Sequence, residues 1–377
     1  MNANFPFTEF CARMASPRLF ASRIRFVSTT LLAALLLLSL SPALRAQYVV
    51  TPLDSNLTAE GTNPVDSDLV NAWGITSLGG SPLWVSDNGT GLSTLYNSAG
   101  VLQKLVVTIM AAGGSAAQGQ PTGVLGNTSP SSFVVSVTTG GITKSGKATF
   151  LFATLDGAIE GWNSGVLPTT AVIGADRSKF GASYSALAIF TNTSGESFLY
   201  ATNTIKGGGI DMFNGSFGFV QTFSDPGIPQ DFAPYGIRLI NGQLWVTYTS
   251  TKKANSGFVA VFEISNTDGT LTKLFEIHGP LHQPWGLALA PPDFGPFSND
   301  VLIGDNITRG QINAFDAVTG NFVGVLRDTS GQPIEINELW GLDFGTTGNN
   351  GTPQQLFFTA GPDNYADGLF GVITVGP

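Results

Sequence analysis

Two sets of mostly polar residues recur along this 377-residue chain at intervals of roughly fifty residues. The first set stands three positions before a small residue and consists of Asn71, Gln120, Ser183, Ala233, Gln283 and Glu338. The second set follows short apolar segments and consists of Asn88, Thr138, Asn203, Thr249, Asn306 and Gly361. Two carboxylates, Asp87 and Asp305, directly precede members of the second set. Because carboxylate and amide oxygens are the ligands that Ca²⁺ prefers, Asp87, Asn88, Asp305 and Asn306 are candidate calcium ligands.

The same residues have a structural interpretation. Asp and Asn that follow a strand are frequent turn formers, because their side chains hydrogen-bond to their own backbone two residues on. Residue type alone therefore leaves both a turn and an ion site open.

The two histidines of the chain, His278 and His282, precede Gln283 closely. His282 is adjacent to Gln283 and is therefore the candidate general base for chemistry near the first set of residues. A histidine that is merely exposed or packed is the alternative. The sequence contains no Gly-x-Ser-x-Gly elbow, phosphate-binding loop or helical pair of metal-binding histidines.

A phrase repeated six times predicts the elements that position these residues. Each copy holds a small residue, usually beside an aromatic residue or proline, and an apolar strand follows about ten residues later. The small residues are Gly74, Gly123, Ala186, Gly236, Gly286 and Gly341. A period of roughly forty to fifty residues is typical of a four-stranded propeller blade. The sequence therefore predicts an all-β protein with one domain, a six-bladed β-propeller over residues 47–377, in which the small residues lie where the inner strands converge.

The strands of each unit can be assigned from apolar and β-branched segments bounded by turn residues. In the first unit they cover residues 73–76, 83–88, 92–97 and 102–109, and in the second unit the second strand covers residues 133–138, before an insertion at residues 139–147. The sixth unit ends after three strands, whereas residues 48–53 have no partner of their own. We therefore expect residues 48–53 to pair with residues 369–374, which closes the propeller and removes an exposed edge.

Residues 1–46 are predicted to be a signal peptide. Arginines precede a short apolar run at residues 31–38, and small residues follow near Ala46. The run is too short to span a bilayer, so we expect a secreted or periplasmic protein without a stable membrane anchor. The remaining chain carries 12 basic and 25 acidic residues, a net charge of −13, which disfavours nucleic acid as a partner. The only cysteine, Cys11, lies in the leader.

Three blocks at residues 68–75, 83–91 and 152–163 resemble an uncharacterised family of exported bacterial proteins. The resemblance covers essentially the whole chain after residue 46. It implies a six-bladed propeller that is distantly similar to NHL-repeat proteins and to calcium-dependent lactonases, and it implies no established activity. The basic residue that NHL repeats carry on the third strand is absent from residues 92–97.

Two functions remain open at this point. The first is a monomeric binding module that holds a protein or glycan partner on one face of the propeller, and the absence of a nucleophile favours it. The second is a divalent-metal-dependent hydrolase or lyase of the lactonase kind. In both cases Asn71, Gln120, Asn203, Gln283 and Glu338 are expected to ring the mouth of the central channel.

Overall fold

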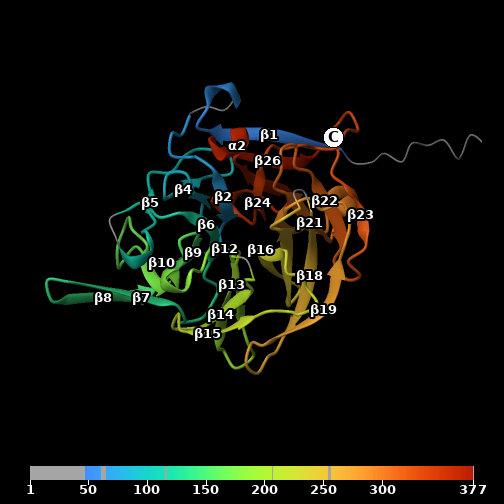
Figure 1. The fold of residues 1–377 in the computed structure, drawn as a ribbon. Coiled ribbons are helices and arrows are strands. Elements are labelled where there is room, and N and C mark those ends of the chain that lie inside the picture. The colour runs from blue at the N-terminus through green and yellow to red at the C-terminus, as the bar shows by residue number, and fades with distance from the viewer. Residues whose placement is uncertain (1–46, 61–64, 115–116, 206, 254–255, 377) are drawn as a thin grey trace, which may run out of the picture. The chain divides into compact units, whose positions relative to one another are not determined.

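The computed structural model describes residues 47–60, 65–114, 117–205, 207–253 and 256–376, and this part of the chain forms six four-stranded sheets (Figure 1). All strand pairs within these sheets are antiparallel, and each sheet is one blade of a β-propeller. The six-bladed, all-β architecture predicted from the repeat is therefore confirmed. The predicted signal peptide lies outside the described residues. Among the described residues, no helix has the length and hydropathy needed to cross a membrane.

The blades share one order of strands from the channel outward. The inner strands are β2 (Ala72–Thr76), β6 (Pro121–Gly126), β12 (Tyr184–Thr191), β16 (Phe232–Ile240), β20 (Pro284–Leu289) and β24 (Leu339–Phe344). The second strands are β3 (Leu83–Asp87), β9 (Phe150–Thr154), β13 (Ser197–Asn203), β17 (Gln243–Ser250), β21 (Asp300–Asp305) and β25 (Gln355–Ala360).

The outer half of each blade follows the same order. The third strands are β4 (Leu92–Tyr96), β10 (Ala158–Trp162), β14 (Ile210–Asn214), β18 (Gly257–Ile264), β22 (Ile312–Asp316) and β26 (Leu369–Val375). The outer strands are β5 (Val107–Thr108), β11 (Val172–Asp176), β15 (Phe219–Phe223), β19 (Leu271–Ile277), β23 (Phe322–Val325) and β1 (Tyr48–Ser55). Short helical turns join some strands: η1 (Thr58–Glu60), η2 (Ala112–Gly114), η3 (Ser178–Phe180), η4 (Gly295–Phe297), η5 (Gly348–Asn350) and α2 (Pro362–Tyr365).

The small residues of the repeat lie where neighbouring inner strands touch. A Cβ atom on Gly74 would lie 2.6 Å from the carbonyl oxygen of Thr122 in the next blade, and one on Gly286 would lie 2.3 Å from that of Trp340. These distances are below van der Waals contact, so a larger side chain would push the inner strands apart.

Strand β1 closes the ring as the outer strand of the sixth blade. It pairs antiparallel with β26, with Tyr48 opposite Val375. The hydroxyl of Tyr48 donates a hydrogen bond to the carbonyl oxygen of Phe294 at 2.9 Å, which ties the strand to the fifth blade as well. The predicted closure by residues 48–53 is therefore confirmed.

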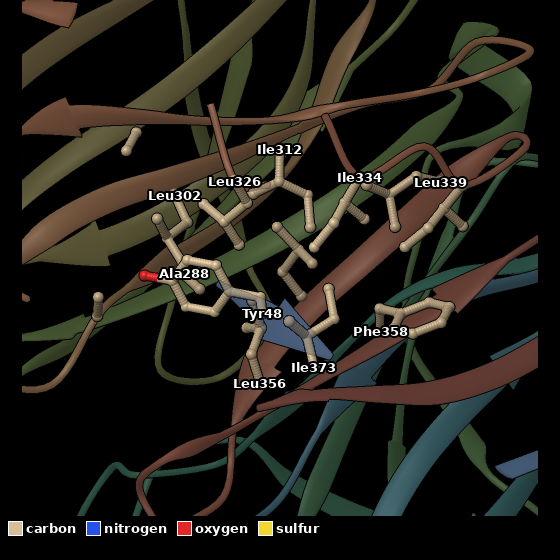
Figure 2. Packing of buried hydrophobic residues seen from close by; sticks show 14 of the residues in the cluster. Tyr48, Ala288, Leu302, Ile312, Leu326, Ile334, Leu339, Leu356, Phe358 and Ile373 are labelled. Atoms are coloured by element: carbon tan, nitrogen blue, oxygen red, sulfur yellow. The ribbon is translucent and has the colours of Figure 1, made fainter. Parts of the chain in front are cut away.

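Apolar side chains from facing blades form the core. Figure 2 shows the cluster between the fifth and sixth blades, where Leu302 and Ile312 meet Leu339 and Phe358, and Tyr48 joins them from β1. The β-branched and aromatic side chains that dominate these strands suit pleated surfaces packed face to face.

The second blade corrects the sequence-based assignment. The segment expected to be its second strand belongs to a separate hairpin of β7 (Val134–Thr139) and β8 (Ile142–Lys147), and β9 takes its place in the blade. Figure 1 shows the hairpin projecting away from the blade. Phe133 and Val135 are buried at its base, whereas Ile142 near its tip is 70% exposed. Both segments are apolar, so composition alone assigned the wrong one to the sheet.

Candidate functional site at the entry mouth of the channel

The inner strands all begin at one end of the central channel, which we call the entry mouth. There the residue after the second strand of a blade donates its backbone N–H to the carbonyl oxygen of the residue before the inner strand. The bonds join Asn88 to Asn71 (3.2 Å), Leu155 to Gln120 (3.0 Å), Asn306 to Gln283 (3.0 Å) and Gly361 to Glu338 (3.0 Å). The two sets of polar residues therefore lie side by side, except that Leu155 occupies the position expected for Thr138, which lies in the β7–β8 hairpin instead.

In three blades, the residue directly before the inner strand has left-handed backbone angles. The φ angles are 48° at Asn71, 57° at Gln283 and 49° at Glu338. Such angles are uncommon outside glycine and persist only where the surrounding structure enforces them. In all three blades, the carbonyl oxygen of the left-handed residue accepts the backbone N–H of the residue that follows the second strand.

The amides of Asn71 and Asn88 join three blades in one chain of hydrogen bonds. The indole nitrogen of Trp340 donates to Oδ1 of Asn71 at 3.0 Å. Nδ2 of Asn71 donates to Oδ1 of Asn88 at 3.3 Å, and Nδ2 of Asn88 donates to the carbonyl oxygen of Pro121 at 3.1 Å. Both amide oxygens therefore accept hydrogen bonds from protein groups.

Asn306 and Asn203 are also engaged by the protein. Nδ2 of Asn306 donates to the carbonyl oxygen of Leu339 at 3.2 Å, and its Oδ1 accepts the hydroxyl of Tyr365 at 3.0 Å. Oδ1 of Asn203 accepts the backbone N–H of Ser183 at 3.1 Å, within the third blade. Asn88 and Asn306 thus make the same link, from a second strand to the inner strand of the next blade.

The two candidate carboxylates are buried in separate blades. Oδ2 of Asp87 accepts both the backbone N–H and the hydroxyl of Thr94, and burial raises the pKa of Asp87 well above its ordinary value. Asp305 accepts the backbone N–H of His282 at 2.8 Å and Nδ2 of Asn313 at 3.2 Å. Burial raises the pKa of Asp305 to about 8. Burial therefore favours the protonated form of both carboxyl groups.

Ca²⁺ binds ionised carboxylates and oxygen atoms that are free to coordinate it, and the calcium site at these residues stays a prediction. Burial raises the pKa of Asp87, and the oxygens of Asn71, Asn88 and Asn306 accept protein hydrogen bonds that a calcium ion would have to replace. Within the described ranges, no three His, Cys, Asp or Glu side chains lie together in a group that could hold a metal.

His282 lies at the entry mouth beside Asp305. Its Nδ1 is 3.5 Å from Oδ2 of Asp305, and its side chain is 46% exposed. A general base often has this arrangement, in which one imidazole nitrogen faces a carboxyl group and the ring is open to solvent. His278 is 68% exposed, stacks on Phe258 and lies 3.1 Å from Glu276 at the end of the outer strand β19.

An aromatic cluster, which the sequence analysis missed, fills the channel near the entry mouth. It consists of Trp73, Tyr235, Trp285 and Trp340, each directly before the small residue of its inner strand. Trp73 stacks on Trp340 with 3.6 Å between ring centroids, and the edge of Trp285 meets Trp73 at 6.0 Å. Tyr235 reaches Trp340 at 5.9 Å from the fourth blade.

The position of Trp73, Trp285 and Trp340 beside the small residue of the repeat predicts burial near the inner strands between blades. All three are buried, with exposed fractions of 6%, 7% and 1%. Their rings meet one another across the channel, however. The repeat showed the aromatic position, but only the ring closure shows that these positions face one axis.

Tyr365 caps this cluster. It ends a left-handed turn in which Asp363, Asn364 and Tyr365 have φ angles of 57°, 54° and 69°. Its ring lies 5.6 Å from that of Trp340, and its side chain remains 39% exposed. Burial and the negative charge of Glu338 raise the pKa of the Tyr365 hydroxyl. Glu338 is itself 5% exposed and accepts the hydroxyl of Thr308 at 2.8 Å.

No protein-family model matches the chain. The chain is 29% identical over 323 residues to the uncharacterized protein L690 of Acanthamoeba polyphaga mimivirus. The aligned region covers 81% of this chain and 80% of that protein. It is also 29% identical over 230 residues to protein R640 of the same virus, over 58% of this chain and 41% of that one. Both relatives are viral, whereas the resemblance in the sequence implied bacterial proteins.

A solved structure shares the fold. A gluconolactonase from Xanthomonas campestris, XC5397, superposes with a TM-score of 0.52 at 12% identity, over 82% of this chain and 87% of that one. The chain is therefore a six-bladed β-propeller that resembles gluconolactonase-type propellers. At this level of identity the likeness concerns the fold alone.

Proposed function

We propose that the protein is a binding module that holds a glycan at the entry mouth. The observation that carries the proposal is the aromatic cluster of Trp73, Tyr235, Trp285 and Trp340, which ends in the partly exposed ring of Tyr365. Aromatic rings with a polar tip are suited to a surface that is apolar on one side and wet on the other.

The surroundings of Tyr365 favour a sugar over a large apolar partner. The negative face of an aromatic ring attracts the C–H groups of a pyranose, and the carboxylate of Glu338 and the amide of Gln283 supply acceptors for its hydroxyls nearby. The carboxyl groups of Asp87 and Asp305 are engaged in hydrogen bonds within the protein, which supports binding without metal chemistry. A protein partner on the same face is the other outcome.

A glycan array probed with the chain from residue 47 onward tests this proposal. We expect saturable binding that Tyr365→Ala abolishes and Tyr365→Phe weakens only a few-fold, since Phe keeps the ring and loses the bond to Asn306. Phe322→Ala is the matched control, because Phe322 is 47% exposed on an outer strand. Equal binding by Tyr365→Ala would contradict the site, and an array without hits would contradict the ligand class.

A second candidate function is that of a divalent-metal-dependent hydrolase or lyase of the lactonase kind, which acts at the same mouth. The observation that favours it is the approach of His282 to Asp305 at 3.5 Å, with the imidazole open to solvent. A panel of lactones and esters tests it, with and without added Ca²⁺ or Mg²⁺. Turnover that His282→Gln abolishes and His278→Gln preserves would support this candidate over the binding module.

We also propose that the protein is exported and monomeric. The signal peptide predicted for residues 1–46 supports export. The closed ring of blades, which leaves no unpaired strand at its seam, supports a monomer. N-terminal sequencing of the exported protein should begin at Gln47, and light scattering should give the mass of one chain.

A further inference from the structure

A cavity lies on the axis of the propeller beyond the aromatic cluster. It has a volume of about 260 Å³ and is lined by inner strands of all six blades, at and after their small residues. Trp285 belongs both to its wall and to the aromatic cluster, so the cavity begins where the cluster ends. It therefore occupies the part of the channel where the inner strands end, which we call the exit end.

Arg238 is the only charged side chain among the residues that line this cavity. The other lining side chains are aliphatic, apart from the hydroxyls of Thr76 and Thr128 and the indole of Trp285. Arg238 is 38% exposed, so its guanidinium reaches solvent at the exit end.

An ion pair holds this guanidinium across the channel. Nη2 of Arg238 lies 2.5 Å from Oδ1 of Asp343, and Nη1 donates to the carbonyl oxygen of Leu342 at 3.1 Å. Arg238 belongs to the fourth blade and Asp343 to the sixth, so the contact passes the fifth blade between them. The side chain of Asp343 is only 9% exposed and does not line the cavity, so it fixes the arginine from behind.

The guanidinium keeps hydrogen-bonding capacity toward the cavity. An arginine has five N–H donors, and these two contacts engage one hydrogen on each terminal nitrogen. Among the described residues, no acceptor is bonded to Nε of Arg238 or to the remaining hydrogens. A rigid fork of donors on an otherwise apolar wall suits a carboxylate.

We propose that this cavity is a second binding site, which takes a small carboxylic acid with a flat apolar body. The carboxylate meets Arg238, and the body lies against Trp285 and the aliphatic walls of Val124 and Leu187. The volume is below the roughly 300 Å³ at which pockets begin to hold drug-sized ligands, so the ligand carries a single ring or a short chain. This proposal does not rest on glycan binding at the entry mouth, although Trp285 belongs to both places.

Benzoate is the probe that tests the proposal, with benzamide as its neutral counterpart and benzylammonium as its cationic one. Calorimetric titration of the chain from residue 47 onward should show saturable binding of benzoate and at least tenfold weaker binding of the two counterparts. Tryptophan fluorescence should change on benzoate binding, and Trp285→Phe should remove that change. Equal affinity for benzoate and benzamide would overturn the role of the guanidinium.

Variants separate a binding arginine from a purely structural one. Arg238→Gln should weaken benzoate more than tenfold, whereas Arg309→Gln, which breaks the exposed pair with Glu335, should leave it unchanged. Asp343→Asn should tighten benzoate binding several-fold, because it removes a negative charge close to the place of the benzoate carboxylate and keeps an oxygen that accepts from Arg238. If Arg238→Gln fails to fold, Asp343→Asn decides, and weaker or unchanged binding in that variant overturns the proposal. Tyr365→Ala should not affect benzoate, so failure here is distinguishable from failure at the entry mouth.

Discussion

Trp340 combines more contacts than any other aromatic residue of the entry mouth. It stacks on Trp73, meets Trp285, Tyr235 and Tyr365, and donates its indole N–H to Asn71. We expect Trp340→Ala to lower the free energy of unfolding by about 3–5 kcal/mol, because the remaining rings cannot fill the space that the indole leaves. Urea denaturation measures this. Trp340→Phe keeps part of the ring and should cost less, and a loss below about 1 kcal/mol for Trp340→Ala would contradict the packing role.

Glu160 makes stability depend on pH. It is fully buried in the second blade, where one oxygen accepts the backbone N–H of Met110, and burial raises its pKa from 4.5 to about 8. The folded protein therefore holds a proton that the unfolded chain releases near pH 4.5, so this contribution is complete below pH 4.5 and is lost as the pH rises to 8.

Glu160→Gln should flatten the fall in stability between pH 4.5 and 8 by about 1–3 kcal/mol, because glutamine does not titrate. Urea unfolding at pH 5 and pH 8 measures the difference. Glu263→Gln, on the third strand of the fourth blade, serves as the exposed control. Parallel profiles for wild type and Glu160→Gln would show that Glu160 does not supply the slope.

The calcium site expected from the sequence stays a prediction. Calcium at about a hundredfold excess over its dissociation constant would stabilise the fold by roughly 3 kcal/mol, and Asp87→Asn or Asp305→Asn would remove that increment. Melting curves in calcium and in chelator measure it. Superimposable curves would contradict the site and agree with the hydrogen bonds that Asp87 and Asn88 make within the protein.

Asn88 and Asn306 show where the sequence stops predicting the site. Their type and spacing placed them at the ends of second strands, and they lie there. An asparagine in that position suits a turn, an ion or a link between blades equally well. The neighbouring blade decides between these roles, because its inner-strand carbonyl oxygens at Pro121 and Leu339 accept hydrogen bonds from the side-chain amides of Asn88 and Asn306. The position of the neighbouring blade cannot be read from a single sequence.

Among the elements, strand β1 has the clearest measurable role. Removing residues 47–55 should lower the melting temperature by roughly 10 °C. The deletion exposes the edge of β26 and removes Tyr48 from the core between the fifth and sixth blades. Differential scanning calorimetry measures this. Tyr48→Phe is the matched control and should cost only the single bond to Phe294. An unchanged melting temperature in the truncated chain would refute closure by β1.

The β7–β8 hairpin marks the limit of prediction at the level of elements. The three inner strands predicted for the first blade agree with the structure to within one residue, whereas its outer strand is β5 (Val107–Thr108) and not the whole of residues 102–109. In the second blade two apolar segments compete for one place in the sheet, and both satisfy the composition of a strand. Pairing of β9 with both β6 and β10 decides between them, and such long-range pairing is not visible in local pattern.

For the whole molecule, the meeting of the two ends of the propeller predicts tolerance to circular permutation. Tyr48 lies opposite Val375, and the backbone N–H of Gly376 donates to the carbonyl oxygen of Gln47. Joining these ends with a short linker and opening the chain between Gly140 and Gly141, at the hairpin tip, should preserve the circular dichroism spectrum and a single melting transition. Opening it at Gly286, inside an inner strand, should prevent folding. Failure of the first permutant would contradict the independence of the hairpin tip.

The position of β1 also sets an order of events during synthesis. The strand leaves the ribosome before any blade exists, yet its partner β26 spans Leu369–Val375 and is made last. We expect β1 to stay unpaired and the seam to stay open until residues 369–375 have been synthesised, because ring closure depends on contacts between parts of the sequence that lie far apart. A product that stops short of residue 369 cannot close at all. We expect the unpaired edges of such a product to favour proteolysis and aggregation, whereas pairing with β26 covers the edges of both β1 and β25.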